Sequence, residues 1–591
     1  MNDKDRARHT AMDDVVPQQA TWLGHIRHGC LGFAVLALAG SVVVGLYALI
    51  AASRPDCVGS CPDRTVATGW GWSVVAASAA LLIAAAVVRM LRGPLTRRGD
   101  RTDIVGALAL AYLLVVGIAA TEVQPWTDLH WLLTLRPTTT QGPAVAAAGL
   151  LSMLGAVALG LGRRAVSHDW KPVPRSAIGG AALALIVVAA SIVVAANAGD
   201  DSRFVQASTA GDGGVPPAPS VFGEQRFHIR FSDRPADPNQ ARFDYPDILS
   251  AGSAFVVFDR SRGELIAYEF DGQQRWHYRR TGPDVLRVID AHVYDDGRTL
   301  VVALANSNGG PDAKHTFIGL DAVSGQQLWM RSGELLEDAF WPGHYPSPYF
   351  VARQRQSWTA FNPRTGKQIW QISNPDRCGS PGQLDGASGL LVDVDICQGE
   401  GAITYTLVTV DAATGNVVRR QQLQHIENGS GPLEGQRVEK AGGDGVVVTI
   451  TWPDGRRLNT YANAVTGHTT DLGATYVSTD EARGRGFFTQ SESGFVNLIG
   501  ADGMQRCTFP FAVSPVGDGS HVGIAWYPHQ LAYTNDIVGD RTYLRVADRE
   551  TCQIQQSLPI TGEPLTLRTA RGVTVLLSTD DTGVYLTGYS S

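Results

Sequence analysis

Long apolar runs without charged residues dominate the first 200 positions of the chain. Each of five runs can cross a hydrocarbon core about 30 Å thick as a helix, which takes about 20 residues. The runs are Leu31–Ser53, Thr68–Val88, Ile104–Thr121, Pro137–Leu161 and Ser176–Gly199. They predict a five-helix transmembrane bundle over residues 31–199, after a cytoplasmic tail over residues 1–30. Because no run has an ionisable residue in its middle, transport by this bundle is not expected. Their Gly and Ala content favours close helix packing over a quinone or lipid pocket.

The pattern changes after the last apolar run. Residues 200–222 are small and polar and become rich in proline, which predicts a linker that lets the following domain stand off the membrane. Over residues 223–591, short β-type runs such as Phe255–Phe258 and Thr299–Leu304 alternate with turns that contain Gly and Asp. We therefore expect an all-β domain there.

One phrase recurs along this β part: a short apolar strand, Asp or Asn, a turn ending in Gly, and often a Trp four positions later. Its residues are Asp271, Gly272, Trp276, Asp321, Gly325, Trp329, Asn362, Gly366 and Trp370, and in weaker copies Asp411, Gly415, Asn463, Gly467, Asp502, Gly503 and Asp548. The turns recur about every 47 residues, the length of one four-stranded propeller blade. Asp or Asn can bond the turn backbone and Gly accepts positive φ. For the Trp side chains, packing between neighbouring blades is favoured over ligand contact.

The strand-Asp-x-x-Thr-Gly-x-x-x-Trp phrase resembles the PQQ-like (pyrroloquinoline quinone) repeat of eight-bladed β-propellers, over roughly residues 224–591. The resemblance implies a propeller and two contrasting functions. Similar propellers occur in quinoprotein alcohol and glucose dehydrogenases, and in a non-catalytic lipoprotein that scaffolds the assembly of outer-membrane barrels. The membrane-bound glucose dehydrogenases also place five spans before the propeller.

The two chain ends are expected to close the propeller. Seven phrases account for seven blades, and three strands follow them, at Leu565–Arg568, Val573–Ser578 and Val584–Tyr589. A single β run at Arg226–Phe231 precedes the first phrase. Joining it to the last three strands completes an eighth blade and removes two exposed edges. Seven blades with a C-terminal appendage is the alternative.

Charge divides the chain in the same way as hydropathy. Residues 1–220 carry a net charge of +3 and residues 221–591 a net charge of -10. The apolar runs exclude a purely cytosolic enzyme, and the acidic C-terminal part argues against a nucleic-acid partner.

Thirteen Lys and Arg lie in the tail and the second and fourth loops, against three in the first and third loops. Because basic loops stay in the cytoplasm, the N-terminus is expected inside and the β domain outside. The chain has only five lysines, which suggests a GC-rich bacterial genome and hence a bacterial cytoplasmic membrane.

The cysteines agree with this topology. Cys30 is expected inside, and the other six outside, where disulfides form. The expected pairs are Cys57 with Cys61, Cys378 with Cys397, and Cys507 with Cys552. For Cys57 and Cys61, a disulfide is favoured over a metal site because no His is nearby.

Catalytic signals are weak. About 46 residues per blade leave little room for the inserts that hold PQQ and calcium in the glucose dehydrogenases, and the adjacent Cys-Cys pair of the alcohol dehydrogenases is missing. Asp393 and Asp395 come nearest to a hard-cation pair, but alternate strand residues commonly face solvent together. No zinc or phosphate-loop motif occurs, and the scattered histidines select no catalytic group. No cofactor is expected, except PQQ with calcium under the enzymatic alternative.

Two functions therefore stay open. The first is a binding or scaffold module that presents a propeller to envelope proteins or glycolipids outside the cytoplasmic membrane. The second is a quinoprotein-type dehydrogenase that donates electrons to membrane quinone. Blade length and the missing site motifs favour the first.

Overall fold

The computed structural model describes residues 15–50, 56–57, 62–90, 141–162 and 175–198 of the N-terminal part. From residue 204 to 590 it describes all but residues 212, 234–245, 282–285, 307–314, 342–348, 355–356, 374–384, 388, 400–401, 428–435, 443, 452–456, 474–475, 479–485, 491–494, 510–522 and 539–540. The chain divides into two compact units, one mainly helical and one mainly β.

Four helices in the described N-terminal residues are long and apolar enough to cross a membrane. They are α2 (Val15–Ile50), α3 (Pro62–Met90), α6 (Gln141–Gly162) and α7 (Arg175–Ala198). Each corresponds to one of the five predicted runs, and the remaining run, Ile104–Thr121, lies outside the described residues. Helix α2 begins well before Leu31, so part of the expected tail is helical.

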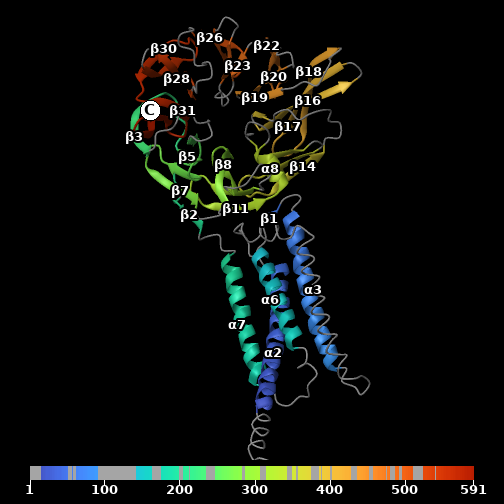
Figure 1. Ribbon diagram of the computed structural model, residues 1–591. Coiled ribbons are helices and arrows are strands. Elements are labelled where there is room, and N and C mark those ends of the chain that lie inside the picture. Colours follow the sequence, from blue (N-terminus) through green and yellow to red (C-terminus); the bar gives the residue numbers. More distant parts are fainter. Residues whose placement is uncertain are drawn as a thin grey trace, which may run out of the picture. The chain divides into compact units, whose positions relative to one another are not determined.

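Figure 1 shows these helices as a bundle. Small residues lie at several of the contacts among them. A Cβ on Gly40 of α2 would lie 2.5 Å from Val188 of α7, and one on Gly155 of α6 would lie 2.7 Å from Leu38 of α2. Such close approach is possible only where side chains are small. These contacts show the close helix packing that the Gly and Ala content predicts.

A chain of hydroxyl groups crosses the helical unit. The Oγ atoms of Ser41 and Ser78 lie 3.1 Å apart, and those of Ser78 and Ser152 lie 2.7 Å apart. Ser41 also donates to the carbonyl of Ala148 at 2.7 Å. All three serines are fully buried, so the hydroxyls satisfy one another away from solvent and tie α2, α3 and α6 together.

The rest of the described chain forms eight sheets, numbered here in chain order. Sheet 1 orders β2 (Val205–Ser208), β7 (Gln274–Arg280), β6 (Glu264–Tyr268), β5 (Phe255–Asp259) and β4 (Asp247–Leu249). Sheet 2 orders β1 (Asp56–Cys57), β11 (Gln327–Ser332), β10 (Thr316–Asp321), β9 (Thr299–Asn306) and β8 (Leu286–Tyr294). Sheet 3 orders β12 (Val351–Gln354), β13 (Ser357–Phe361) and β14 (Gln368–Ser373), and sheet 4 orders β15 (Asp385–Ala387), β16 (Leu390–Gly399), β17 (Ala402–Asp411) and β18 (Val417–Glu427).

The remaining sheets have four strands each. Sheet 5 orders β19 (Gln436–Gly442), β20 (Gly445–Thr451), β21 (Arg457–Asn463) and β22 (Thr469–Gly473). Sheet 6 orders β23 (Tyr476–Ser478), β24 (Gly486–Gln490), β25 (Val496–Gly500) and β26 (Gln505–Phe509). Sheet 7 orders β27 (Ile524–Trp526), β28 (Gln530–Val538), β29 (Arg541–Asp548) and β30 (Ile554–Pro559), and sheet 8 orders β3 (Glu224–Ser232), β33 (Gly583–Ser590), β32 (Thr574–Asp580) and β31 (Glu563–Thr569).

Neighbouring strands within the sheets are antiparallel, except that β1 pairs parallel with β11. A short helix, α8 (Glu334–Phe340), stands between sheets 2 and 3 and packs against β12. The sheets follow one another in chain order in Figure 1.

Sheet 8 combines strands from both ends of the β region. Strand β3 pairs antiparallel with β33, so that Phe227 faces Gly588 and Ile229 faces Leu586. Strands β32 and β31 complete the sheet. The predicted pairing of Arg226–Phe231 with the last three strands is confirmed.

The apolar core of the β region lies between consecutive sheets. Trp358 and Trp370 of sheet 3, for example, share a buried cluster with Leu391 of sheet 4. Phe227 of sheet 8 shares another with Phe255 of sheet 1, and their rings stack with centroids 6.2 Å apart. The last sheet therefore packs against the first.

Candidate binding site

The turn of each repeat is built by its Asp or Asn. Oδ1 of Asp321 accepts the backbone N–H groups of Val323 at 3.1 Å and Ser324 at 2.9 Å. Asn362, Asp411, Asn463 and Asp548 accept equivalent pairs. The backbone then turns left-handed at the last turn residue, with φ of 74° at Gly325, where glycine carries no steric penalty.

The tryptophan of one repeat holds the turn of the next. Nε1 of Trp276 donates to the carbonyl of Ala322 at 3.0 Å, and a Cβ on Gly325 would lie 2.8 Å from the indole. Trp329 makes the same pair of contacts with Pro363 and Gly366, and Trp370 makes them with Ala412 and Gly415. The structure thus brings together phrase residues from successive repeats, and it uses them for packing.

The weaker repeats replace this contact with other chemistry. At the tryptophan position of sheet 4, Arg419 donates to the carbonyl of Val465 at 2.9 Å. In sheet 5 the contact comes from another strand, β21, where the hydroxyl of Tyr461 donates to the carbonyl of Ala501 at 2.8 Å. Between sheets 6 and 7, Cys507 and Cys552 form the expected disulfide, with Cα atoms 5.7 Å apart.

The other cysteines are described only in part. Cys397 is disulfide-bonded. Its expected partner Cys378 lies outside the described residues, as does Cys61, the expected partner of Cys57. Cys30 is a free thiol and half-buried.

The expected linker does not stand free. Its first described residues form β2, which pairs with the outer strand of sheet 1. Farther along, the N–H of Ala210 donates to Ser324 at 2.9 Å, and Pro217 accepts the N–H of Gly572 at 2.9 Å. The described residues 204–211 and 213–223 therefore follow the turns of several sheets, and their proline content restricts the backbone there.

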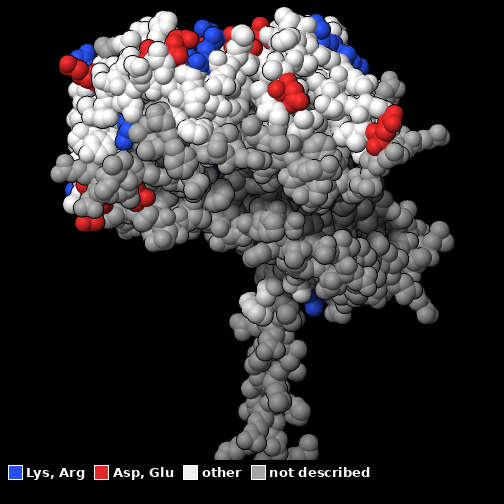
Figure 2. Space-filling model, turned by 90° about the horizontal axis from the view of Figure 1, so that it is seen from above, with Lys and Arg blue, Asp and Glu red and all other residues white. Residues whose placement is uncertain are grey.

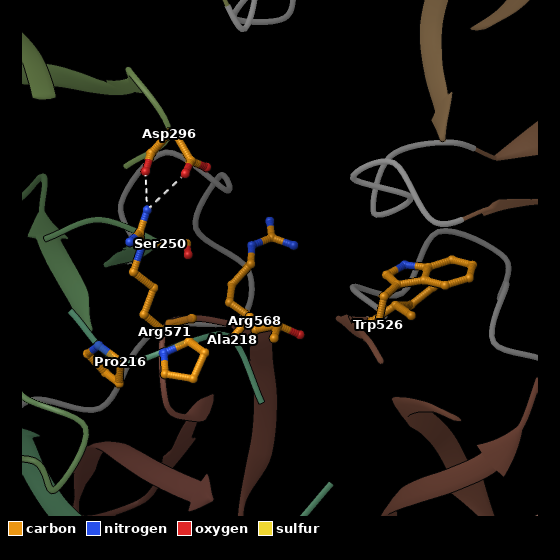
Figure 3. A pocket seen from close by; sticks show the side chains of 11 residues that line it. Pro216, Ala218, Ser250, Asp296, Trp526, Arg568 and Arg571 are labelled. Carbon is orange, nitrogen blue, oxygen red and sulfur yellow. Dashed lines mark hydrogen bonds and ion pairs between the residues drawn. The ribbon is translucent and has the colours of Figure 1, made fainter. Parts of the chain in front are cut away.

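A pocket of about 430 Å³ opens beside this segment (Figure 3). Four sheets and the proline segment contribute to its wall, all within the β unit. The lining residues are Pro216, Pro217, Ala218, Ser250, Asp296, Ile524, Trp526, Arg568, Thr569, Ala570 and Arg571. They come from five separate parts of the chain, which only the fold brings together.

Two arginines dominate the chemistry of the pocket. Nη2 of Arg571 lies 3.2 Å from Oδ2 of Asp296 and also donates to the backbone carbonyl of that residue. Arg568 extends into the space between this pair and Trp526 (Figure 3). The ring of Trp526 is buried, and the guanidinium of Arg549 lies 5.2 Å from its centroid. Sequence reasoning missed these residues, since two arginines near a hairpin turn give no local signal.

Asp393 and Asp395, the residues nearest to a hard-cation pair in the sequence, take part in ion pairs with arginines. Both are buried, contrary to the solvent-facing pair expected, because each has an arginine partner from another strand. Asp393 accepts two hydrogen bonds from Arg353, at 2.7 and 2.6 Å, and Asp395 lies 3.0 Å from Nη1 of Arg420. Paired carboxylates of this kind do not fit a calcium-held quinone. No group of three or more metal-ligating side chains occurs among the described residues.

Two of the scattered histidines meet at α8. The ring of His292 stacks on Phe340 with centroids 4.0 Å apart, and the ring of His315 lies 4.4 Å from Trp341. Burial raises the pKa of Asp290, but the hydrogen bond and charge of His292, with the charge of Arg260, outweigh it and hold that pKa below its usual value. Burial lowers the pKa of His315, against the opposing charge of Glu337. These contacts serve packing.

Charged side chains are mixed elsewhere on the described surface. Figure 2 shows Asp and Glu beside Lys and Arg along one face of the molecule. This face does not present the basic stripe that nucleic-acid binding requires.

Comparisons with known proteins support the PQQ-like repeat but identify no specific function or partner. No curated protein matches the chain. Similar solved structures include one titled Structure of U3-55K, at 10% identity and a TM-score of 0.29, covering 61% of this chain and 98% of that one. Kluyveromyces lactis Hsv2 matches at 15% identity and a TM-score of 0.31, covering 54% and 100%. A eukaryotic initiation factor matches at 8% identity and a TM-score of 0.37, covering 57% and 82%. These TM-scores are too low to support a statement about fold or function.

The family comparison is more informative. Residues 245–461 match the family described as outer membrane protein assembly factor BamB. The matched segment contains the three complete phrases with Trp276, Trp329 and Trp370. This match confirms the resemblance drawn from the sequence: over residues 245–461 the chain carries repeats of the PQQ-like family.

Proposed function

We propose that the chain is a membrane-anchored binding or scaffold module whose β region forms a closed eight-bladed propeller outside the cytoplasmic membrane of a bacterium. Two observations support the closure. Strand β3 completes sheet 8 beside β33, and sheet 8 shares its core with sheet 1. Each sheet then serves as one blade, with α8 as an insertion between the second and third.

The observation that carries the binding function is the pocket at the proline segment. The Asp, Gly and Trp residues of the repeats are used in turns and between sheets, whereas the residues beside the proline segment line a cavity of ligand size. Among the described residues that line this cavity there is no His, Cys or Glu to act as nucleophile or base. The guanidinium, hydroxyl and ring groups that line the cavity suit recognition of a ligand, so binding is the function proposed. Envelope proteins and glycolipids are the partners proposed.

The directions of the helices support five spans. Gly71 of α3 approaches Val145 of α6, and Ser78 bonds Ser152, so α3 and α6 run parallel. Two consecutive helices that run parallel across a membrane need one further crossing between them. The sequence predicts such a crossing at Ile104–Thr121, a run that lies outside the described residues.

The same reasoning supports the proposed side of the β region. Helices α2 and α7 also run parallel, because Gly32 approaches Ala177 and Gly40 approaches Val188. Each is followed by a strand of the β unit, β1 after α2 and β2 after α7. Both helices therefore end on one side, and the distribution of basic residues makes that side the outer one. An exported reporter fused after Gly199 should be active and a cytoplasmic reporter silent; the reverse result would refute this topology.

Partner capture tests the binding function. The tagged full chain would be crosslinked in intact cells, recovered from mildly solubilised membranes, and compared with an unrelated five-span protein carrying the same tag. We expect specific envelope components that recover the chain again when they are tagged in turn. Reduction of a dye by protein reconstituted with PQQ and Ca²⁺, without specific partners, would instead establish the dehydrogenase.

A further inference from the structure

We propose that the open edge of β18 accepts an extended segment of an envelope protein as an added strand of sheet 4. The inference rests on the proposed binding function and gives it a surface apart from the pocket at the proline segment. Three features carry it: the strand additions already present on sheets 1 and 2, the length of β18, and the side chains beside its open edge.

The outer strands of sheets 1 and 2 each carry an added strand from outside the repeats. Strand β2 pairs antiparallel with β7, where residues 205–208 face residues 277–280. Strand β1 pairs parallel with β11 at Arg331 and Ser332. Both added strands pair with the part of the outer strand that follows its tryptophan, away from the repeat turn. Outer strands of this protein therefore accept a further strand in either direction, which is the mode of β-strand addition.

Strand β18 offers the longest such edge among the described residues. It has 11 residues, and within the described part of the chain it pairs only with β17. Arg419 stands at its tryptophan position, and Arg420–Glu427 continue the strand past it. Of the other outer strands with an open edge, β3 has nine residues and β14, β22, β26 and β30 have five or six. Because short edge strands discourage pairing and long ones invite it, β18 is the outer strand best suited to a partner.

A bulge divides this edge into two straight stretches. The ladder with β17 skips Leu423, which leaves three paired residues, 420–422, before the bulge and four, 424–427, after it. Strands β1 and β2 pair with their outer strands over two and four residues. Each stretch of β18 is thus long enough for a pairing of the kind already present.

The side chains of β18 define the pattern of the added strand. Leu423 and Ile426 are half-buried and pack against the apolar cluster shared by sheets 4 and 5, whereas Gln422 and His425 are exposed. Side chains alternate between the two faces of a sheet. Every second side chain of an added strand would therefore cover Leu423 and Ile426, and the others would lie beside Gln422 and His425. The partner segment is expected to alternate apolar and polar residues.

Peptides test whether the edge accepts a strand. The purified full chain in detergent micelles would be titrated with a fluorescent peptide in which valine and threonine alternate between terminal lysines. Two control peptides have the same residues, one with the valines in a single block and one with every backbone nitrogen methylated, so that it donates no hydrogen bond. We expect the alternating peptide to bind at least about tenfold more tightly than either control and to protect β18 from hydrogen exchange. Equal binding of the three peptides, or protection of other strands alone, would overturn the proposal.

Proline variants assign the interaction to β18. Neighbouring residues of an edge strand direct their N–H groups alternately to the paired strand and to the open edge. One of Gln421→Pro and Gln422→Pro therefore removes a donor from the open edge and keeps the pairing with β17. We expect that variant to melt like wild type and to bind the alternating peptide at least about tenfold more weakly, and the other variant to melt at a lower temperature.

Ile426→Lys is a second test that leaves the backbone unchanged. It should also weaken binding at least about tenfold, because the added strand would cover its charge. Ile372→Lys is the matched control, since Ile372 is likewise half-buried on an outer strand, β14, and its peptide affinity should not change.

Other outcomes would refute the site. These are unchanged affinity in folded Ile426→Lys or in the proline variant that melts like wild type, and an equal loss in Ile372→Lys. A dimer that forms a disulfide through Gln422→Cys would show that a second copy occupies the edge, which also overturns the proposal. Captured envelope partners without peptide binding would remove this inference alone, whereas absence of both would also remove the binding function.

Discussion

Cys507 and Cys552 form a disulfide at the two positions that a tryptophan and a glycine fill between earlier sheets. Cys507 follows Gly503 by four residues, as Trp276 follows Gly272. Cys552 follows Asp548 by four residues, as Gly325 follows Asp321, and it adopts the same left-handed backbone, with φ of 57°. Sγ of Cys507 also lies 3.4 Å from the carbonyl of Arg549, which corresponds to the carbonyl that Trp276 contacts. Neighbouring repeats can therefore be joined at this place either by a disulfide or by a tryptophan that packs on a glycine.

Removing this disulfide should destabilise the β region. The bond closes a loop of 45 residues, for which the loss of unfolded-state entropy corresponds to about 4 kcal/mol. Cys507→Ala with Cys552→Ala should show this loss in urea unfolding. Cys507→Trp with Cys552→Gly should recover part of it by restoring the packed contact. If the second variant is no more stable than the first, the two contacts are not equivalent.

Gly415 tests the contact between repeats. An alanine there would adopt φ of 77° and place its Cβ 2.8 Å from the indole of Trp370. We expect Gly415→Ala to lower the free energy of unfolding by about 2 to 4 kcal/mol, through backbone strain and overpacking together. Gly389→Ala is the control, since φ is 82° there but no atom lies within 4 Å of the new Cβ. Its expected loss is about 1 to 2 kcal/mol. Equal losses in chemical denaturation would contradict the packing role.

Deleting the last ten residues tests closure. The deletion removes β33 and leaves β3 without its partner. The deletion also leaves β32 without β33. Since Val584 and Leu586 lie on β33, the core shared by sheets 8 and 1 loses both side chains. We expect the whole β region to melt at a lower temperature and to become sensitive to protease. A truncated chain that melts like the intact one would refute the closed propeller.

Asp321 should contribute to the acid dependence of stability. Burial raises the pKa of its carboxyl, but the hydrogen bond from Ser324 and the guanidinium of Arg364 outweigh this and lower the pKa. A lowered pKa in the folded state stabilises the protein above the unfolded pKa of about 4, and the contribution is lost as pH falls through the folded value. Asp321→Asn keeps the turn, since Asn362 has the same role. The stability difference between wild type and variant, from urea midpoints, should shrink between about pH 5 and pH 3. A constant difference would contradict this assignment.

The hydroxyl chain in the helical unit can be tested with one substitution. Ser78→Ala removes the link between Ser41 and Ser152, at an expected cost of about 0.6 to 1 kcal/mol. Ser73→Ala, on the same helix, is the control because Ser73 is exposed and bonds only to Gly69 of its own helix. Unfolding in mixed micelles with increasing SDS measures both. Equal midpoints would show that the chain adds no stability.

Local patterns predicted the helices and the repeat turns. An apolar run long enough to cross a bilayer has few possible structures other than a helix. The turn from Asp321 to Gly325 depends only on contacts within five consecutive residues. The pairing of β3 with β33 could also be predicted, because one strand before the repeat array and three strands after it together make one four-stranded sheet. The fifth run falls outside the described residues and stays a prediction.

Contacts between distant segments could not be predicted in this way. Asp393 suggested a cation site because its partner, Arg353, comes from another sheet and has no fixed spacing from it. The proline segment suggested a free linker because its contact with Gly572 joins positions more than 300 residues apart. The pocket has the same origin, since Arg568 and Trp526 meet only after the sheets have assembled.

The mixed origin of sheet 8 delays the completion of folding during synthesis. About 350 residues separate the end of β3 at Ser232 from the start of β33 at Gly583. At about 5 to 20 residues per second, β3 emerges some 20 to 70 s before its partner exists. During that interval Phe227, Ile229 and Phe231 lie on a strand with an open edge, which invites pairing with other chains. Folding of the β region is thus expected to depend on a chaperone that shields β3 until β33 has been synthesised.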